Sequence, residues 1–143
     1  MPTIVLGHSM GCGIVTRLNL NAVGKVIFVA PTAGNESLRL YRRYGSNIVD
    51  GKLTVSTDGR KKYMSKEYVA SMQGIVWEDE YRALLDRYHE VYVFEAENEE
   101  IVGEDRFALR KLPFAGYTII PGATHNLHGE ALERFIVQCS DLL

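Results

Sequence analysis

The sequence predicts an α/β fold in which a mostly parallel sheet is flanked by helices. Strand-length runs that are almost entirely apolar recur along the chain, first at residues 3–6 and again at residues 25–30. Such runs are typical of strands that are buried on both faces of a parallel sheet. A glycine-rich turn and a helical pattern separate the two runs, which is the order of a βαβ unit.

The length and composition agree with one globular domain. The chain has 143 residues, of which 46% are hydrophobic and 24% are charged, a balance typical of a protein with a packed core. The formal net charge is −2 and the basic residues are scattered, so we expect no nucleic-acid partner. No apolar run approaches the roughly 20 residues that cross a bilayer, and no signal-peptide pattern is present. We therefore expect no membrane partner and a cytoplasmic location.

The sequence contains no pattern typical of a metal or dinucleotide site. Cys12 and Cys139 are far apart and lack the spacing of zinc ligands, which favours two free thiols in a reducing compartment. His125 and His128 have no third ligand at metal spacing. The run that begins at Gly11 reads G-x-G-x-x-T, so the third glycine of a dinucleotide-binding turn is missing.

The first predicted elements follow one another closely. The strand of residues 3–6 leads through the glycine-rich turn into a helix at about residues 12–21, where apolar residues recur at helical spacing. The second strand, residues 25–30, is bounded by Gly24 and Pro31.

The middle of the chain, residues 32–88, is more polar and rich in Tyr and Arg. Asp58-Gly59 lies between two β-prone runs, which predicts a hairpin. Ser65 is a suitable N-cap for a helix that ends at about Gln73. A second helix is predicted for residues 78–88, and the residues that share its apolar face are Tyr81, Leu84, Leu85 and Tyr88.

The last part of the chain returns to the first pattern. Strands are predicted at residues 91–94 and 117–120, with an acidic loop at residues 95–100 and a short helix at residues 107–111 between them. A final helix covers about residues 129–142. Its predicted inner face consists of Leu132, Phe135, Ile136 and Cys139.

One motif indicates chemistry. Gly7-His8-Ser9-Met10-Gly11 follows a buried strand and opens a helix, which is the setting of a G-x-S-x-G nucleophile elbow. The sharp turn would hold Ser9 at strained backbone angles, and a Cβ on either flanking glycine should collide with a neighbouring element. The same geometry would direct the Met10 backbone N–H to the point where an oxyanion develops.

A serine nucleophile needs a histidine base that a third group orients. His125 lies after the last predicted strand and before the last helix, as such a base should. His128 would point elsewhere, His8 lies inside the elbow, and His89 precedes a strand. The acid should follow the preceding strand, in the acidic loop of residues 95–100. An isolated acidic run is often only a solvated loop, and its place between strand and histidine loop makes it the candidate here.

Three segments together resemble the second half of the α/β-hydrolase fold: the strand leading into Gly-His-Ser-Met-Gly, the acidic loop ending in Ile-Val, and Pro-Gly-Ala-Thr-His-Asn-Leu. The order serine, acid, histidine also agrees with that family. The resemblance covers nearly the whole chain, but only from the nucleophile strand onward, so it implies a truncated α/β-hydrolase-like fold. It further implies a core of residues 1–31 and 89–143, with residues 32–88 as a hairpin-plus-helix cap.

The resemblance also implies which carboxylate completes the site. Many members of the family carry G-x-x-D-x-x-V after the strand that supplies the acid. Laid over this chain, the pattern puts Ala96 at the glycine, Glu99 at the acid and Val102 at the valine. The acid is then Glu in place of the commoner Asp, and the glycine is lost. The acidic residues that remain alternatives are Glu97, Glu100 and Asp105.

The function implied by the resemblance is that of an esterase-like serine hydrolase acting on a small ester or acyl substrate without a cofactor. Ser9 would be the nucleophile, His125 the base, Glu99 the orienting acid and Met10 the source of one oxyanion N–H. In the family a loop of the first half supplies a second oxyanion donor. We expect that half to lie outside this chain.

The strand that begins at Thr3 and ends at Leu6 would then have an unpaired apolar edge. We expect a second copy of the chain or another partner chain to cover it. The alternative hypothesis for function follows from the same edge. A non-catalytic or split hydrolase remnant could retain the triad residues and act as an interaction subunit.

Overall fold

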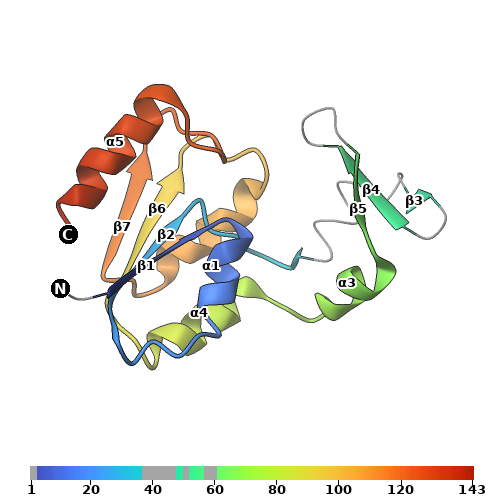
Figure 1. The fold of residues 1–143 in the computed structure, drawn as a ribbon, viewed down its shortest axis with the longest axis horizontal. Helices are drawn as coiled ribbons and strands as arrows, with labels where there is room; N and C mark the ends of the chain where they lie inside the picture. The colour runs from blue at the N-terminus through green and yellow to red at the C-terminus, as the bar shows by residue number, and fades with distance from the viewer. Residues whose placement is uncertain (1–2, 37–47, 50–51, 57–60) are drawn as a thin grey trace.

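The computed structural model describes residues 3–36, 48–49, 52–56 and 61–143. In this part of the chain a parallel sheet has the strand order β1-β2-β6-β7 (Figure 1). All three neighbouring pairs are parallel, so the predicted mostly parallel sheet is confirmed. The strands are β1 (Thr3–His8), β2 (Val23–Val29), β6 (Val91–Ala96) and β7 (Gly116–Ile120).

Helices cover both faces of this sheet (Figure 1). Side chains of β2 alternate between two apolar clusters, since Val26 and Phe28 belong to one and Ile27 and Val29 to the other. The first cluster is completed by α1 (Met10–Val15), α4 (Trp77–Leu85) and the 3₁₀ helix η2 (Gly103–Lys111), and the second by α5 (Gly129–Ser140). Among the described residues, no helix combines the length and the hydropathy needed to cross a bilayer.

A second, antiparallel sheet lies apart from the first (Figure 1). It consists of β3 (Ile48–Val49), β4 (Lys52–Ser56) and β5 (Lys61–Met64). The predicted hairpin is confirmed as β4 and β5, whereas β3 was not expected, and the Asp58-Gly59 turn lies outside the described residues. The predicted N-cap is also confirmed, because Ser65 Oγ accepts a hydrogen bond of 3.0 Å from Tyr68 N at the start of α3 (Lys66–Ser71).

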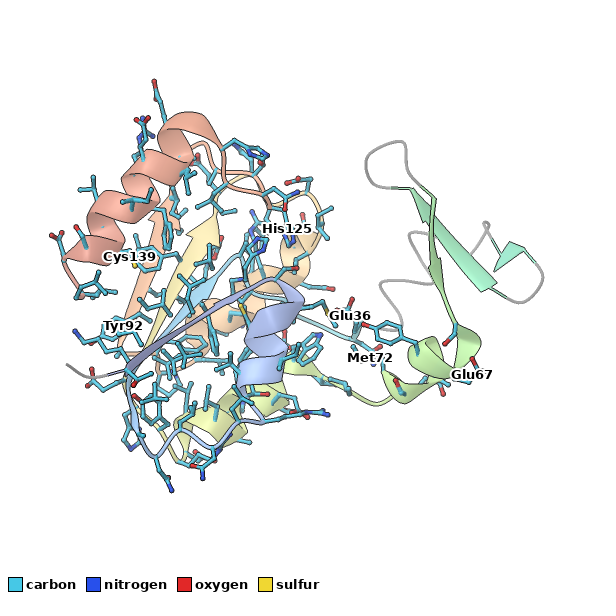
Figure 2. The ribbon with its side chains drawn as sticks, in the orientation of Figure 1. Glu36, Glu67, Met72, Tyr92, His125 and Cys139 are labelled. Atoms are coloured by element: carbon cyan, nitrogen blue, oxygen red, sulfur yellow. The ribbon has the colours of Figure 1, made fainter. Side chains whose placement is uncertain are left out.

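The segment that contains the second sheet leaves the first sheet and returns to it close to one buried carboxylate, Glu36 (Figure 2). Its Oε2 accepts hydrogen bonds from Thr32 Oγ1 at 2.8 Å and from Trp77 Nε1 at 3.1 Å. Trp77 N also donates to Gly34 O. The division into a core and a cap at residues 32–88 stays a prediction. Within that range, α4 packs Trp77 and Tyr81 into the core cluster.

α1 is shorter than predicted: it ends at Val15, whereas the sequence predicted a helix to about residue 21. The chain beyond it turns through side-chain-to-backbone bonds. Thr16 Oγ1 donates to Gly13 O at 2.7 Å, and Asn19 Oδ1 accepts from Asn21 N at 3.1 Å. Such bonds compete with helical hydrogen bonding and favour a turn.

The predicted inner face of α5 is only partly correct. Phe135 and Cys139 pack against the sheet together with Ala131, and Figure 2 shows Cys139 between α5 and the sheet. The Phe135 ring meets the Phe94 ring edge-on, with 5.1 Å between the ring centroids. Leu132 and Ile136, however, are 41% and 55% exposed. Two adjacent stripes of this helix are apolar, and spacing alone does not choose between them. The small side chain of Ala131 lets its stripe approach the sheet.

Glu95 is a charged residue in the core of the sheet, and its side chain is only 1% exposed. It accepts hydrogen bonds from Arg106 Nε at 3.1 Å, Arg110 Nε at 3.0 Å and Tyr117 OH at 2.6 Å. Burial alone would raise the pKa of Glu95, but the bonds from Arg110, Tyr117 and Arg106 outweigh it and lower the pKa. The carboxylate thus joins β6, η2 and β7.

Replacing Gly13 with alanine should destabilise the protein, because the new Cβ would lie 2.3 Å from the Trp77 ring. Overpacking of this kind costs about 1–3 kcal/mol. Gly11→Ala is the matched control, since Gly11 also lies in α1 and its added Cβ would meet nothing within 4 Å. Urea denaturation should show a lower free energy of unfolding for Gly13→Ala than for Gly11→Ala. Equal values would contradict the close packing of α1 on α4.

Glu95→Gln should lower the free energy of unfolding at neutral pH by about 2 kcal/mol, because buried hydrogen bonds to a charged group are lost. The pKa of Glu95 is lowered in the folded state, so its stabilisation is full above the ordinary value near 4.5 and is lost as pH falls through the folded pKa. Denaturation midpoints from pH 7 to 3 should therefore fall less steeply for Glu95→Gln than for wild type. The exposed Glu104→Gln is the control and should keep the wild-type slope.

Candidate active site

Ser9 occupies the sharp turn between β1 and α1. Its backbone angles are φ 55° and ψ −123°, a conformation that residues other than glycine rarely adopt. Hydrogen bonds on both sides hold the turn. Ser9 N donates to Val29 O at 3.1 Å, and Ser9 O accepts from Cys12 N at 3.1 Å. Neighbouring β2 and the start of α1 therefore support the strained residue.

The two glycines that flank the serine motif differ in what they permit. A Cβ on Gly7 would lie 2.9 Å from Cys12 Cα and 3.0 Å from Cys12 N, which are backbone atoms that cannot yield. A Cβ on Gly11 would meet nothing within 4 Å. The expectation of a steric requirement is confirmed at Gly7 and wrong at Gly11, because α1 directs that position away from the described neighbours.

His125 lies where the parallel strands end, in the loop between β7 and α5 (Figure 2). Its Nε2 is 2.8 Å from Ser9 Oγ, and its Nδ1 is 2.9 Å and 2.8 Å from the two carboxylate oxygens of Glu99. The imidazole is largely buried, with 8% of the side chain exposed. Three residues from three separate loops thus form one continuous chain of hydrogen bonds.

Glu99 is held by the backbone of its own loop as well as by His125. Its Oε1 accepts hydrogen bonds from Ile101 N at 2.8 Å and Val102 N at 3.0 Å. Burial alone would raise the pKa of Glu99, but hydrogen bonds from His125 and these backbone groups outweigh it and lower the pKa. An ionised carboxylate can only accept a hydrogen bond, so Nδ1 of His125 is the donor to Glu99. In the neutral imidazole Nε2 is then the acceptor for the Ser9 hydroxyl.

The three alternative acids make other contacts. Glu97 Oε2 accepts from Gly122 N at 2.7 Å, and Glu100 Oε2 accepts from His125 N at 2.9 Å. Asp105 lies against Gly34, where an added Cβ would come within 2.5 Å of its carboxylate. Among the carboxylates described, Glu99 is the one hydrogen-bonded to the His125 ring. Its catalytic role, like those of Ser9 and His125, stays a prediction.

Sequence reasoning missed two contacts to the backbone of His125. Glu100 binds its N–H, and His8 Nε2 lies 2.8 Å from its carbonyl oxygen. Both residues stand inside segments that the sequence singled out, but no spacing rule indicates that a side chain will reach a backbone group 25 positions away, as for Glu100, or 117 positions away, as for His8. His128 is the N-cap residue of α5 and His89 is exposed, and neither joins the site.

The remaining groups near the elbow restrict what the site can do. Cys12 is fully buried and donates to Gly7 O, and burial raises the pKa of its thiol, so it stays protonated and unreactive. Met10 is the first residue of α1, directly after Ser9. In the described ranges, no three His, Cys, Asp or Glu side chains are grouped as metal ligands would be. The arrangement suits proton transfer between a serine hydroxyl and a histidine.

Comparison with known proteins gives matches among solved structures. No family model matches this sequence, and no curated protein does so. The chain is similar to the esterase domain of a Rhodothermus marinus protein, with a TM-score of 0.65, 19% identity, and coverage of 94% of this chain and 57% of that one. It is also similar to Est1E from Butyrivibrio proteoclasticus in a structure with ferulic acid bound, with a TM-score of 0.60, 23% identity, and coverage of 95% and 59%.

A third structure with this arrangement is the peroxisomal α/β-hydrolase Lpx1 from Saccharomyces cerevisiae. The TM-score is 0.51 and the identity 16%, and the match covers 97% of this chain and 54% of that one. The chain thus spans between half and three fifths of the length of these structures. At such identities the likeness concerns the fold, and it agrees with the parallel sheet and flanking helices described above. The chain therefore has the fold of part of an α/β-hydrolase.

Proposed function

We propose that this chain is a serine hydrolase that cleaves small carboxylic esters. The observation that carries the proposal is the hydrogen-bonded chain from Ser9 Oγ through the His125 ring to Glu99, with 2.8 Å at each junction. A serine hydroxyl becomes a useful nucleophile when a neutral imidazole can take its proton and a buried carboxylate stabilises the resulting imidazolium.

In the proposed reaction Ser9 Oγ attacks the ester carbonyl carbon while His125 Nε2 takes the hydroxyl proton. The Met10 backbone N–H donates to the oxyanion that forms on the carbonyl oxygen. Collapse of this intermediate expels the alcohol, which receives the proton from His125, and leaves Ser9 acylated. A water molecule then attacks the acyl group, again with His125 as base, and releases the acid and free Ser9. The reaction requires no cofactor.

The names of the similar structures support esters as the substrate class. One is an esterase domain, and another holds ferulic acid, an aromatic carboxylic acid. Because this chain spans only part of their length, a second oxyanion donor would have to come from beyond the residues present here. Its loss costs about 10²–10³ in rate, so we expect the chain by itself to turn over slowly.

A non-catalytic interaction subunit is the second candidate, and the edge of β1 favours it. Within the described residues β1 is hydrogen-bonded to β2 on one side and ends the sheet on the other. Leu6 on this strand is 52% exposed, and an exposed apolar edge strand favours pairing with another chain. We propose that a second copy or a different chain covers this edge, whichever function the site has.

Ser9→Ala should abolish hydrolysis of short-chain p-nitrophenyl esters, with a fall of about 10⁶ in kcat if the triad acts as a unit. A fluorophosphonate probe should label wild-type protein at Ser9 and leave the variant unlabelled. The exposed Ser140→Ala is the control and should behave as wild type. Folded wild-type protein that neither hydrolyses esters nor reacts with the probe would contradict the enzyme and favour the interaction subunit.

Glu99→Gln should lower kcat by about 10⁴, because an amide cannot stabilise the imidazolium and can favour the wrong tautomer of His125. Glu97→Gln is the matched control: it removes one charge from the same loop but leaves the His125 ring untouched. Initial rates of ester hydrolysis compared with thermal midpoints separate loss of activity from loss of fold. Equal activity of the two variants would assign the orienting role to another residue.

A further inference from the structure

We infer that His8 is a positioning residue that holds the backbone of His125 at its working distance from Ser9; the inference rests on the proposed function. His8 is the last residue of β1 and directly precedes Ser9. Its Nε2 lies 2.8 Å from the carbonyl oxygen of His125, and the two imidazole rings are 5.1 Å apart.

The direction of this hydrogen bond follows from its acceptor. A carbonyl oxygen has no hydrogen to donate, so His8 Nε2 must carry the proton. His8 can donate in this way both as the neutral Nε2–H tautomer and as the imidazolium. The bond therefore requires only an N–H donor at the position of His8 Nε2. It does not require a side chain that takes up or releases protons during the reaction.

The bond from His8 completes the fixation of His125 from both sides of its backbone. Glu100, in the loop after β6, accepts from the His125 N–H at 2.9 Å, and His8, at the end of β1, donates to its carbonyl. The ring itself is held by Glu99 and contacts Ser9. Of the two backbone bonds, the one from His8 comes from the residue directly before the nucleophile, so it links the segment that carries Ser9 to the backbone of His125.

The hydrogen bond from His8 would help to set the distance between Ser9 Oγ and His125 Nε2, and proton transfer depends on that distance. Ser9 Oγ and His125 Nε2 must stay within hydrogen-bond reach, and a misplacement of about 1 Å can cost 10²-fold in rate. Glu99 fixes the ring at Nδ1 but not the loop that carries it. Without His8, the loop between β7 and α5 would keep its hydrogen bonds to the segment after β6, from Gly122 N to Glu97 and from His125 N to Glu100, and would lose the bond that His8 donates from the end of β1.

The surroundings of His8 make a test practical. His8 is exposed and borders an open pocket of about 290 Å³ whose wall includes Leu6, Leu127 and Phe135. Replacing the imidazole would enlarge an open pocket and create no closed cavity, so the fold should tolerate substitution. A change in activity can then be separated from a change in stability.

Two amide variants distinguish a positioning donor from other roles. His8→Gln carries an amide nitrogen about as far from the backbone as His Nε2, whereas in His8→Asn it falls one bond short. We expect kcat for ester hydrolysis to fall about 10- to 100-fold in His8→Asn with little change in KM, and to stay within about threefold of wild type in His8→Gln. Thermal midpoints of both variants should match wild type.

An activity of His8→Asn equal to that of wild type would overturn the inference. So would an equal loss in His8→Gln and His8→Asn, since that would mean that the imidazole itself is required. If His8→Asn fails to fold, His8→Leu provides the comparison, because it has similar bulk and no donor.

A second measurement is independent of turnover. In protein labelled with ¹⁵N-histidine, NMR reports the exchange of the His125 Nδ1 proton with solvent. We expect faster exchange in His8→Asn and the wild-type rate in His8→Gln; equal rates in both would overturn the inference. If the two variants show this pattern but the wild-type protein hydrolyses no ester, the result would contradict the proposed function alone and leave the positioning role of His8 in place.

Discussion

The parallel pairing of four strands determines where the candidate site forms. His8 of β1 pairs with Val29 of β2, and Ala96 of β6 pairs with Ile120 of β7. Because all strands run in the same direction, their carboxyl ends lie along one edge, and the segments that follow β1, β6 and β7 meet there. A residue from each segment then joins one chain of hydrogen bonds. A change in the register of β1, β6 or β7 by a single position would move one member of that chain by more than 3 Å.

The site also combines local strain with compensation from neighbouring elements. Ser9 has a positive φ, and so does Ala30 at the end of the adjacent strand β2. Each is held by a backbone hydrogen bond to the next strand of the sheet, Ser9 N to Val29 O and Ala30 N to Phe94 O. Such conformations cost on the order of 1–3 kcal/mol each and persist only where the surroundings determine them. Here the surroundings are the neighbouring strands β2 and β6, which supply the two accepting carbonyl groups.

Patterns of short range could be predicted from the sequence, and choices that depend on packing could not. The strand runs, the serine turn, the β4–β5 hairpin and the Ser65 cap follow from residue types over a few positions. The early end of α1 depends on side-chain bonds of Thr16 and Asn19 that residue spacing does not reveal. The inner face of α5 depends on which of two apolar stripes meets the sheet. The choice of Glu99 among four acids rested on a family pattern, because residue type alone does not distinguish one carboxylate of this segment from another.

The end of β6 and the loop after it have a consequence for how such a site can change over time. Glu95, Glu97, Glu99 and Glu100 lie within six positions, and each binds a different part of the molecule: the arginines of η2, the backbone of Gly122, the His125 ring and the His125 backbone. An inserted or deleted residue would put every later carboxylate out of reach of its partner at once. Single substitutions would break these contacts one at a time. This segment should therefore vary in composition much more readily than in length. Its length sets which groups of the neighbouring histidine loop each carboxylate can reach.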